Sequence, residues 1–223
     1  MIPQSIPTPP KAAADILIQA IDPTGPRPPA TQVVKALLDT ERAAKHPQSP
    51  LDSETFLGLW QLWFTASKKP AYKAGEPTGK GFYWPALAPG TLRFSRPTPD
   101  SPSSSPPDPA SPGPDLLTIE NQIRLGPLAL RFSGPAKFLA KQNLLAFDFV
   151  RIQVFVGAVR LFQCPIKGRA GTEDWAATPI AKLPFFAFFA ATDHYLAARG
   201  RGGGLALWAK GEVLDALRES KVK

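Results

Sequence analysis

The placement of proline divides this chain into stretches that can carry regular structure and stretches that cannot. Of its 27 prolines, 16 lie in residues 1–29 and 97–114. Proline lacks a backbone donor and restricts the residue before it, so these stretches interrupt helices and exclude central strands. The Pro/Ser composition of residues 97–114 predicts a disordered insert in a surface loop. The rest of the chain has the composition of a globular domain.

A period of two residues dominates the middle of the chain. Between Leu117 and Leu125, apolar side chains alternate with Thr118, Glu120, Gln122 and Arg124, as in a strand with one buried face. Residues 183–191 are apolar at every position, which is typical of a strand covered on both faces. Some eight such strands joined by short turns predict a mainly β protein, an antiparallel barrel.

Helical patterns flank these strands. Residues 11–21 and 31–45 each carry one apolar face, and Glu212 to Lys221 predicts a C-terminal helix. We therefore expect residues 1–50 to form a disordered tail plus two short helices. Residues 51–223 would form the barrel domain, with the insert at 97–114 and the terminal helix.

The charge balance favours an anionic partner. The chain has 26 basic and 18 acidic residues, a net charge of +8, which suits nucleic acid, an acidic protein or a lipid surface. Its single cysteine excludes an internal disulfide, and with only two histidines we expect no metal site. No apolar run reaches the ~20 residues that span a bilayer. Without a signal or transit peptide, we expect a location on the cytoplasmic side with peripheral membrane contact.

The sequence has no recognisable catalytic motif, so we expect a protein that is not an enzyme and has no catalytic residues. Asp193-His194 is typical of a surface turn. The glycine-rich run from Arg199 to Gly204 lacks the features of a phosphate loop and predicts a hairpin. A single RGG-type segment for nucleic acid is the sharper alternative.

A G-x-W motif at Gly58-Leu59-Trp60 suggests how the barrel is closed at one end. In lipocalin-like barrels such a tryptophan plugs the bottom, and an arginine from a late strand stacks on it. The expected barrel-closing residues are Trp60 with Arg199 or Arg201.

Phenylalanine is concentrated in the second half of the chain, with ten of 14 between Phe132 and Phe189. An eight-stranded barrel is just wide enough to be filled by side chains or to hold one small ligand, so a packed core and an aromatic cavity remain alternatives. The candidate ligand-cavity residues are Trp60, Leu62, Phe64, Phe132, Phe147, Phe149, Phe185 and Phe188.

Three stretches together resemble the plastid-lipid-associated protein family, also called PAP/fibrillin. They are residues 56–67 (FLGLWQLWFTAS), residues 118–132 (TIENQIRLGPLALRF) and residues 195–208 (YLAARGRGGGLALW). The resemblance covers about residues 30–210, and the lack of a transit peptide favours a cyanobacterial-type member. It implies a lipocalin-like β-barrel, a place at thylakoid membranes or lipid droplets, and binding of carotenoids, quinones or lipids. It implies no catalytic residues.

Two functions follow as hypotheses from these observations. The first is a non-enzymatic barrel that binds a lipophilic molecule such as a carotenoid, quinone, lipid or other pigment, without covalent attachment, at a photosynthetic membrane. The alternative is a scaffold or assembly factor for photosynthetic complexes, with a filled barrel and a photosynthetic protein partner. Nucleic-acid binding through the basic charge and the Arg199–Gly204 segment is a third interpretation. It is the least favoured of the three, and we expect no nucleic-acid partner.

Overall fold

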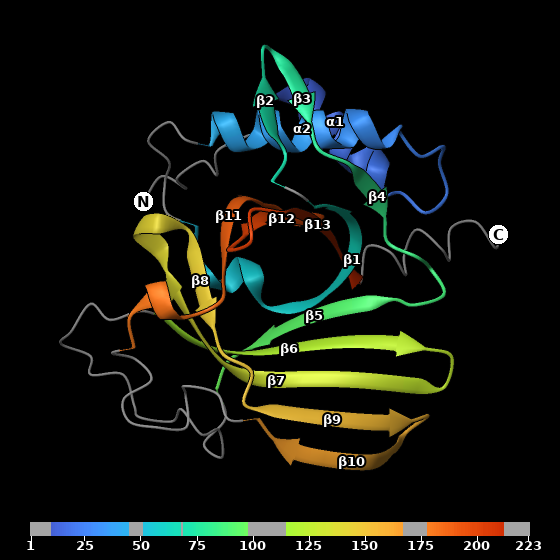
Figure 1. Ribbon diagram of the computed structural model, residues 1–223, viewed down its shortest axis with the longest axis vertical. Coiled ribbons are helices and arrows are strands. Elements are labelled where there is room, and N and C mark those ends of the chain that lie inside the picture. Colours follow the sequence, from blue (N-terminus) through green and yellow to red (C-terminus); the bar gives the residue numbers. More distant parts are fainter. Residues whose placement is uncertain (1–9, 45–50, 68, 98–114, 167–177, 212–223) are drawn as a thin grey trace.

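The computed structural model describes residues 10–44, 51–67, 69–97, 115–166 and 178–211 (Figure 1). The predicted N-terminal tail, nearly all of the insert at 97–114 and the C-terminal helix at 212–221 lie outside these residues.

The helices are α1 (Lys11–Ile21), α2 (Ala30–Ala43) and the short 3-10 helices η1 (Ser53–Phe56), η2 (Ala140–Gln142) and η5 (Ile180–Lys182). The strands of the first half are β1 (Gly58–Ala66), β2 (Ala71–Lys73), β3 (Glu76–Thr78), β4 (Gly81–Tyr83), β5 (Gly90–Ser95) and β6 (Asp115–Leu125). Those of the second half are β7 (Leu128–Leu139), β8 (Leu144–Phe147), β9 (Arg151–Val156), β10 (Val159–Pro165), β11 (Phe185–Ala191), β12 (Tyr195–Gly200) and β13 (Leu205–Lys210).

Within the described residues, eight antiparallel strands close into a barrel in the order β7-β6-β5-β1-β13-β12-β11-β8, completed by the pairing of β8 with β7. The predicted fold class, a mainly β, lipocalin-like barrel accompanied by helices, is confirmed in the described chain. Closure leaves no free edge along this ring, which removes the unpaired backbone groups that an open sheet exposes.

Strand β7 belongs to two structures at once. Its second half pairs with β8 and closes the barrel, whereas Leu128–Ser133 pairs with β9. The chain passes from β8 to β9 beside Gly134, where an added Cβ would lie 1.9 Å from the carbonyl oxygen of Asp148. Only glycine permits that approach, and β8 and β9 are separate strands on either side of this contact. Strands β6, β7, β9 and β10 therefore continue past the barrel as a four-stranded extension, on the side away from α1 and α2 (Figure 1).

The two helices cover one side of the barrel wall. Their apolar faces pack on the outer surface of β1, β11, β12 and β13. We call this the outer cluster; its helical members include Leu17, Ile21, Val33, Val34 and Leu37, and its strand members include Trp63, Phe64, Phe189, Tyr195 and Leu207. Strand β11 is thus apolar on both faces because one faces the barrel interior and the other faces the helices.

Beta-bulges change which face the residues of two strands present. The pairing of β1 with β13 shifts between Leu62 and Phe64, and the pairing of β11 with β12 shifts between Phe188 and Ala190. A bulge inserts one unpaired residue, so every later side chain of the strand turns to the opposite face. The residues that follow, Phe64 and Ala190, accordingly join the outer cluster.

Candidate ligand site and outer polar pocket

One end of the barrel is filled by the segment that precedes β1. Helix η1, whose N-terminal amide at Glu54 donates to the side chain of Asp52, lies inside the ring of strands (Figure 1). Its last residue, Phe56, packs among the side chains of the barrel interior. Phe56 is fully buried, and its ring centroid lies 4.6 Å from that of Phe188 and 4.7 Å from that of Phe138. The indole Nε1 of Trp60 donates to the carbonyl oxygen of Phe56 at 2.7 Å. This end is therefore closed by packed aromatic rings.

We call the side chains inside the barrel the interior cluster. Its buried aromatic members are Phe56, Trp60, Phe94, Phe138, Phe147, Phe188 and Trp208. Leu57, Leu62, Phe149, Phe186 and Ala206 pack against them and are partly buried.

A continuous chain of aromatic contacts runs from the closed end toward partly exposed rings. Successive ring-centroid distances are 6.4 Å for Phe188–Trp208, 5.3 Å for Trp208–Phe186, 5.1 Å for Phe186–Phe147, 5.2 Å for Phe147–Phe149 and 5.7 Å for Phe149–Phe132. Phe56 is 0 % exposed and Phe147 is 6 % exposed, while Phe149 and Phe132 are half-buried. The apolar lining of the barrel thus becomes accessible at Phe186, Phe149 and Phe132, which we call the aromatic mouth.

Six of the eight predicted cavity residues lie on this aromatic path or within the interior cluster. They are Trp60, Leu62, Phe132, Phe147, Phe149 and Phe188. Phe64 and Phe185 do not, so their prediction was wrong. Phe64 follows the β1 bulge and contacts Tyr83 beneath the helices. Phe185 packs outside the barrel with Ala146 and Leu183.

Sequence reasoning missed Phe186 and Trp208, two central members of the aromatic path. Phe185 and Phe188 are three residues apart and cannot share a face of a regular strand. Strict alternation back from Phe188 selects Phe186 instead. Trp208 lies opposite Leu62 in the β1–β13 register, so only the pairing of two distant strands reveals it.

The cation expected over Trp60 comes from a different residue. Lys210, on the last strand of the barrel, places its Nζ 5.7 Å from the Trp60 ring. The assignment to Arg199 or Arg201 was wrong. Alternation on β12 turns Arg199 away from the interior residue Ala198, and its guanidinium forms a bidentate pair with Glu41 of α2, at 2.6 Å for both bonds. Arg201 donates instead to the carbonyl oxygens of Ala181 and Leu183.

The four-stranded extension carries an exposed apolar surface on the same face as the barrel interior. Two cross-strand rows form it, Ile123–Leu130–Val154–Phe162 and Leu125–Leu128–Val156–Val159. We call these eight residues the apolar sheet face. Phe162 is 54 % exposed and Val159 is 63 % exposed, so this surface has no covering element within the described chain.

The chain that builds this extension is purely basic. Residues 121–134 and 149–166 contain four arginines and no aspartate or glutamate. Cross-strand pairing places Arg124, Arg131 and Arg151 on the opposite face from the apolar rows, because they alternate with apolar residues. The extension is therefore apolar on one face and cationic on the other.

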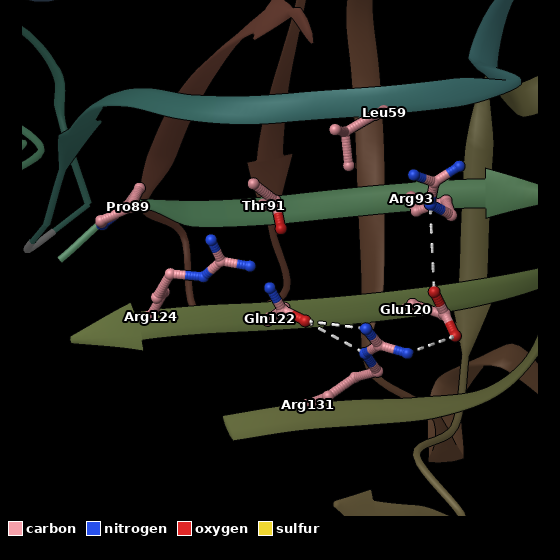
Figure 2. A pocket seen from close by; sticks show the side chains of 8 residues that line it. All are labelled: Leu59, Pro89, Thr91, Arg93, Glu120, Gln122, Arg124 and Arg131. Carbon is pink, nitrogen blue, oxygen red and sulfur yellow. Dashed lines mark hydrogen bonds and ion pairs between the residues drawn. The ribbon is translucent and has the colours of Figure 1, made fainter. Parts of the chain in front are cut away.

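The opposite face holds a polar pocket of about 360 Å³ on the outer surface of β1, β5, β6 and β7 (Figure 2). Its lining residues are Leu59, Pro89, Thr91, Arg93, Glu120, Gln122, Arg124 and Arg131. Three arginines and one glutamate give the pocket a net charge of +2.

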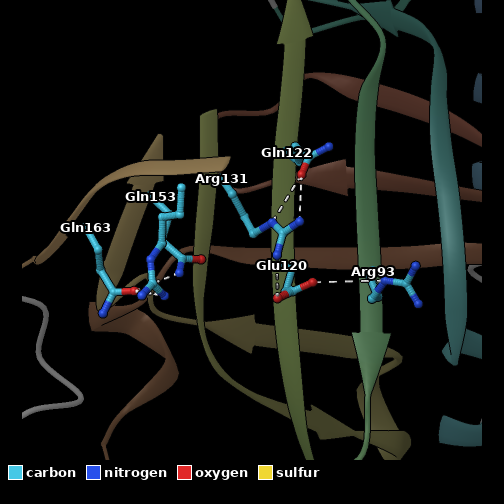
Figure 3. Close-up of polar contacts among 7 residues, drawn as sticks. Arg93, Glu120, Gln122, Arg131, Gln153 and Gln163 are labelled. Atoms are coloured by element: carbon cyan, nitrogen blue, oxygen red, sulfur yellow. Dashed lines mark hydrogen bonds and ion pairs between the residues drawn. The ribbon is translucent and has the colours of Figure 1, made fainter. Parts of the chain in front are cut away.

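Polar contacts fix several of these side chains (Figure 3). Arg131 donates from Nε and Nη2 to Oε1 of Gln122, at 3.1 and 3.0 Å. Glu120 lies between two cations, with Oε1 3.8 Å from Arg131 and Oε2 4.0 Å from Arg93. Arg131 also lies 4.8 Å from the centre of the Phe155 ring.

The remaining candidate features do not form a further site within the described residues. Asp193 and His194 are exposed in the turn before β12, as the sequence predicts. In the described part of the chain, no three His, Cys, Asp or Glu side chains gather where a metal could bind. No helix among the described residues has the length and apolarity to cross a bilayer.

These features define a closed antiparallel barrel of lipocalin-like type, with one aromatic-filled end, an aromatic mouth and a sheet extension. Comparison with protein-family models and with curated protein sequences finds no match to this chain.

Proposed function

We propose that this protein is a non-enzymatic, lipocalin-like carrier that binds or stabilises a lipophilic molecule at a membrane surface. The observation that supports this most directly is the aromatic mouth, where Phe186, Phe149 and Phe132 continue the buried barrel lining to a partly exposed apolar surface. Pockets for small apolar ligands are lined in this way by aromatic side chains with few polar groups. The resemblance to the plastid-lipid-associated family agrees with a carotenoid, quinone or lipid as the guest, and with a thylakoid membrane as its location.

The membrane contact that we propose uses the apolar sheet face. Leu125, Val159 and Phe162 are each more than half exposed, and a surface of this kind marks a partner or a membrane. The chain's net charge of +8 complements an anionic leaflet, where each Lys or Arg near the membrane surface adds about 1 kcal/mol. A guest leaving the aromatic mouth would then pass along apolar side chains into lipid.

The ligand proposal is tested with the uncharged probe Nile red and the full chain. Phe186→Ala removes a ring of the mouth, whereas Phe185→Ala removes the neighbouring ring, which packs outside the barrel. We expect saturable probe binding that Phe186→Ala weakens about tenfold, the value of a lost apolar contact near 1.4 kcal/mol. Phe185→Ala should leave the affinity unchanged. Equal losses in the two variants, or no saturable binding by the parent protein, would contradict the proposal.

The membrane contact has a separate test by flotation with vesicles of phosphatidylcholine and phosphatidylglycerol. Phe162→Ser should reduce the bound fraction, and Leu87→Ser, at a site 85 % exposed in the loop between β4 and β5 and outside the eight residues of the apolar sheet face, should not. Salt should release the protein, since the cationic contribution is screened. Binding that ignores both Phe162→Ser and salt would refute this contact.

A scaffold for photosynthetic complexes is the second candidate, and the packed rings around Phe56 favour it. A barrel that is filled at this end needs no guest for stability. Deletion of residues 97–114 should then abolish recovery of one defined partner complex. Under the carrier proposal, that deletion leaves Nile red binding intact.

A further inference from the structure

We propose that the outer polar pocket is an oxyanion site that takes a phosphate or sulfate group, either free or as the headgroup of a lipid. The pocket is on the outer face of the barrel wall, so this inference goes beyond the carrier function and does not depend on it. Its volume of about 360 Å³ falls in the range of small-ligand sites, ~300–1,000 Å³.

The orientation of Gln122 follows from the chemistry of Arg131. A guanidinium has only donors, so the side-chain atom of Gln122 that contacts Arg131 at 3.0 and 3.1 Å must be its oxygen. The amide NH₂ of Gln122 is thereby directed away from Arg131. Figure 2 shows it pointing toward Thr91 and the guanidinium of Arg124.

The other groups around this point are also donors. Within the described chain, the Arg124 side chain has no ion pair or hydrogen bond. Its backbone is fixed by a 3.1 Å bond from its N–H to the carbonyl oxygen of Pro89. Thr91 directs its hydroxyl toward the same space (Figure 2). The single carboxylate, Glu120, is flanked by Arg93 and Arg131, which leaves a donor-rich pocket of net charge +2.

A tetrahedral oxyanion matches this arrangement. Guanidinium groups form charge-assisted hydrogen bonds to phosphate and carboxylate oxygens, and these are stronger than hydrogen bonds between neutral groups. Arg124 directly precedes Leu125, which is 61 % exposed in the apolar sheet face. Their side chains lie on opposite faces of β6, so the pocket is reached from the face that the apolar rows do not occupy.

Gln122→Glu provides the sharpest test. The variant keeps an oxygen on Arg131 but turns the pocket-facing NH₂ into a carboxylate oxygen that repels anions. Arg124→Gln removes the free cation. Arg151→Gln is the matched control, because it removes one arginine from the same face of the extension outside the pocket lining. Titration with inorganic phosphate, followed by calorimetry and by the arginine Nε–H signals in NMR, measures the free anion. Flotation with phosphatidylglycerol vesicles measures the headgroup.

We expect at least one of these probes to bind, with about tenfold or greater weakening in Gln122→Glu and Arg124→Gln and little change in Arg151→Gln. If Gln122→Glu and Arg124→Gln weaken phosphate binding, the pocket takes a free anion. If they weaken only vesicle binding, the pocket takes the lipid headgroup. If neither probe binds, or if Arg151→Gln weakens binding as much as Arg124→Gln, the site is refuted. Nile red affinity should be the same in all three variants. The carrier function is therefore tested independently of the oxyanion site.

Discussion

Replacing Phe56 by alanine should destabilise the barrel more than any exposed phenylalanine replacement. The side chain is fully buried between the rings of Phe138 and Phe188, at centroid distances of 4.7 and 4.6 Å. Truncating a buried phenylalanine costs ~3–5 kcal/mol through lost burial and the cavity that remains. Each aromatic pair contributes a further ~0.5–1.5 kcal/mol beyond its buried area. Because Trp60 donates to the main-chain oxygen of Phe56, that hydrogen bond survives the substitution.

Urea unfolding followed by tryptophan fluorescence measures the effect, and Phe162→Ala is the matched control. Phe162 is 54 % exposed, so its truncation should change the free energy of unfolding by less than about 1 kcal/mol. We expect Phe56→Ala to lower it by about 4 kcal/mol with a similar m-value. Benzene should partly restore the stability of Phe56→Ala alone, because a dry apolar cavity binds it. Equal costs for the two variants would refute the filled end of the barrel.

Three further predictions address polar groups. The Tyr195 hydroxyl has no hydrogen-bond partner among the described residues, so Tyr195→Phe should raise the free energy of unfolding by about 1 kcal/mol. Burial raises the pKa of Tyr195 from 10.0 to about 12, so the folded state favours the neutral phenol. The free energy of unfolding should therefore be unaffected by this group below pH 10 and fall by about 2–3 kcal/mol as pH rises to 12. A pH series of urea titrations should show this fall in the parent protein and not in Tyr195→Phe. Arg199→Ala should cost about 1–3 kcal/mol by breaking the 2.6 Å bidentate pair with Glu41, and a double-mutant cycle with Glu41→Gln that shows no coupling would contradict this. Lys210→Met keeps the apolar stem but removes the cation over Trp60, so thermal unfolding should report a loss of about 0.5–1 kcal/mol.

The barrel itself was predictable because its strands obey a local rule. Alternation over residues 117–125 places Leu117 and Ile119 in the interior cluster, as expected. The turn at Gly126-Pro127 and the glycine-rich link before Leu205 join neighbouring strands, with Gly203 at a φ of +85°. Period two and turn chemistry depend on adjacent residues only, so they can be read from the chain.

Errors in the predicted site begin where a bulge breaks that rule. Trp60 and Leu62 face the interior as predicted, but the shift before Phe64 turns that ring toward the helices. A bulge depends on how two strands distant in sequence align, and no local pattern near residue 63 announces it. The same limit applies to Arg199, whose partner Glu41 lies 158 residues away.

The sequence alone determined the class of architecture, the apolar character of the barrel lining and the basic balance of the chain, since each depends on composition or on local periodicity. Tertiary structure decided which rings line the aromatic mouth, which end of the barrel is filled, and which residue covers Trp60. It also brought Arg93, Arg124 and Arg131 from three strands into one pocket. These properties require strand register and ring closure, and both are set by contacts between residues far apart in the chain.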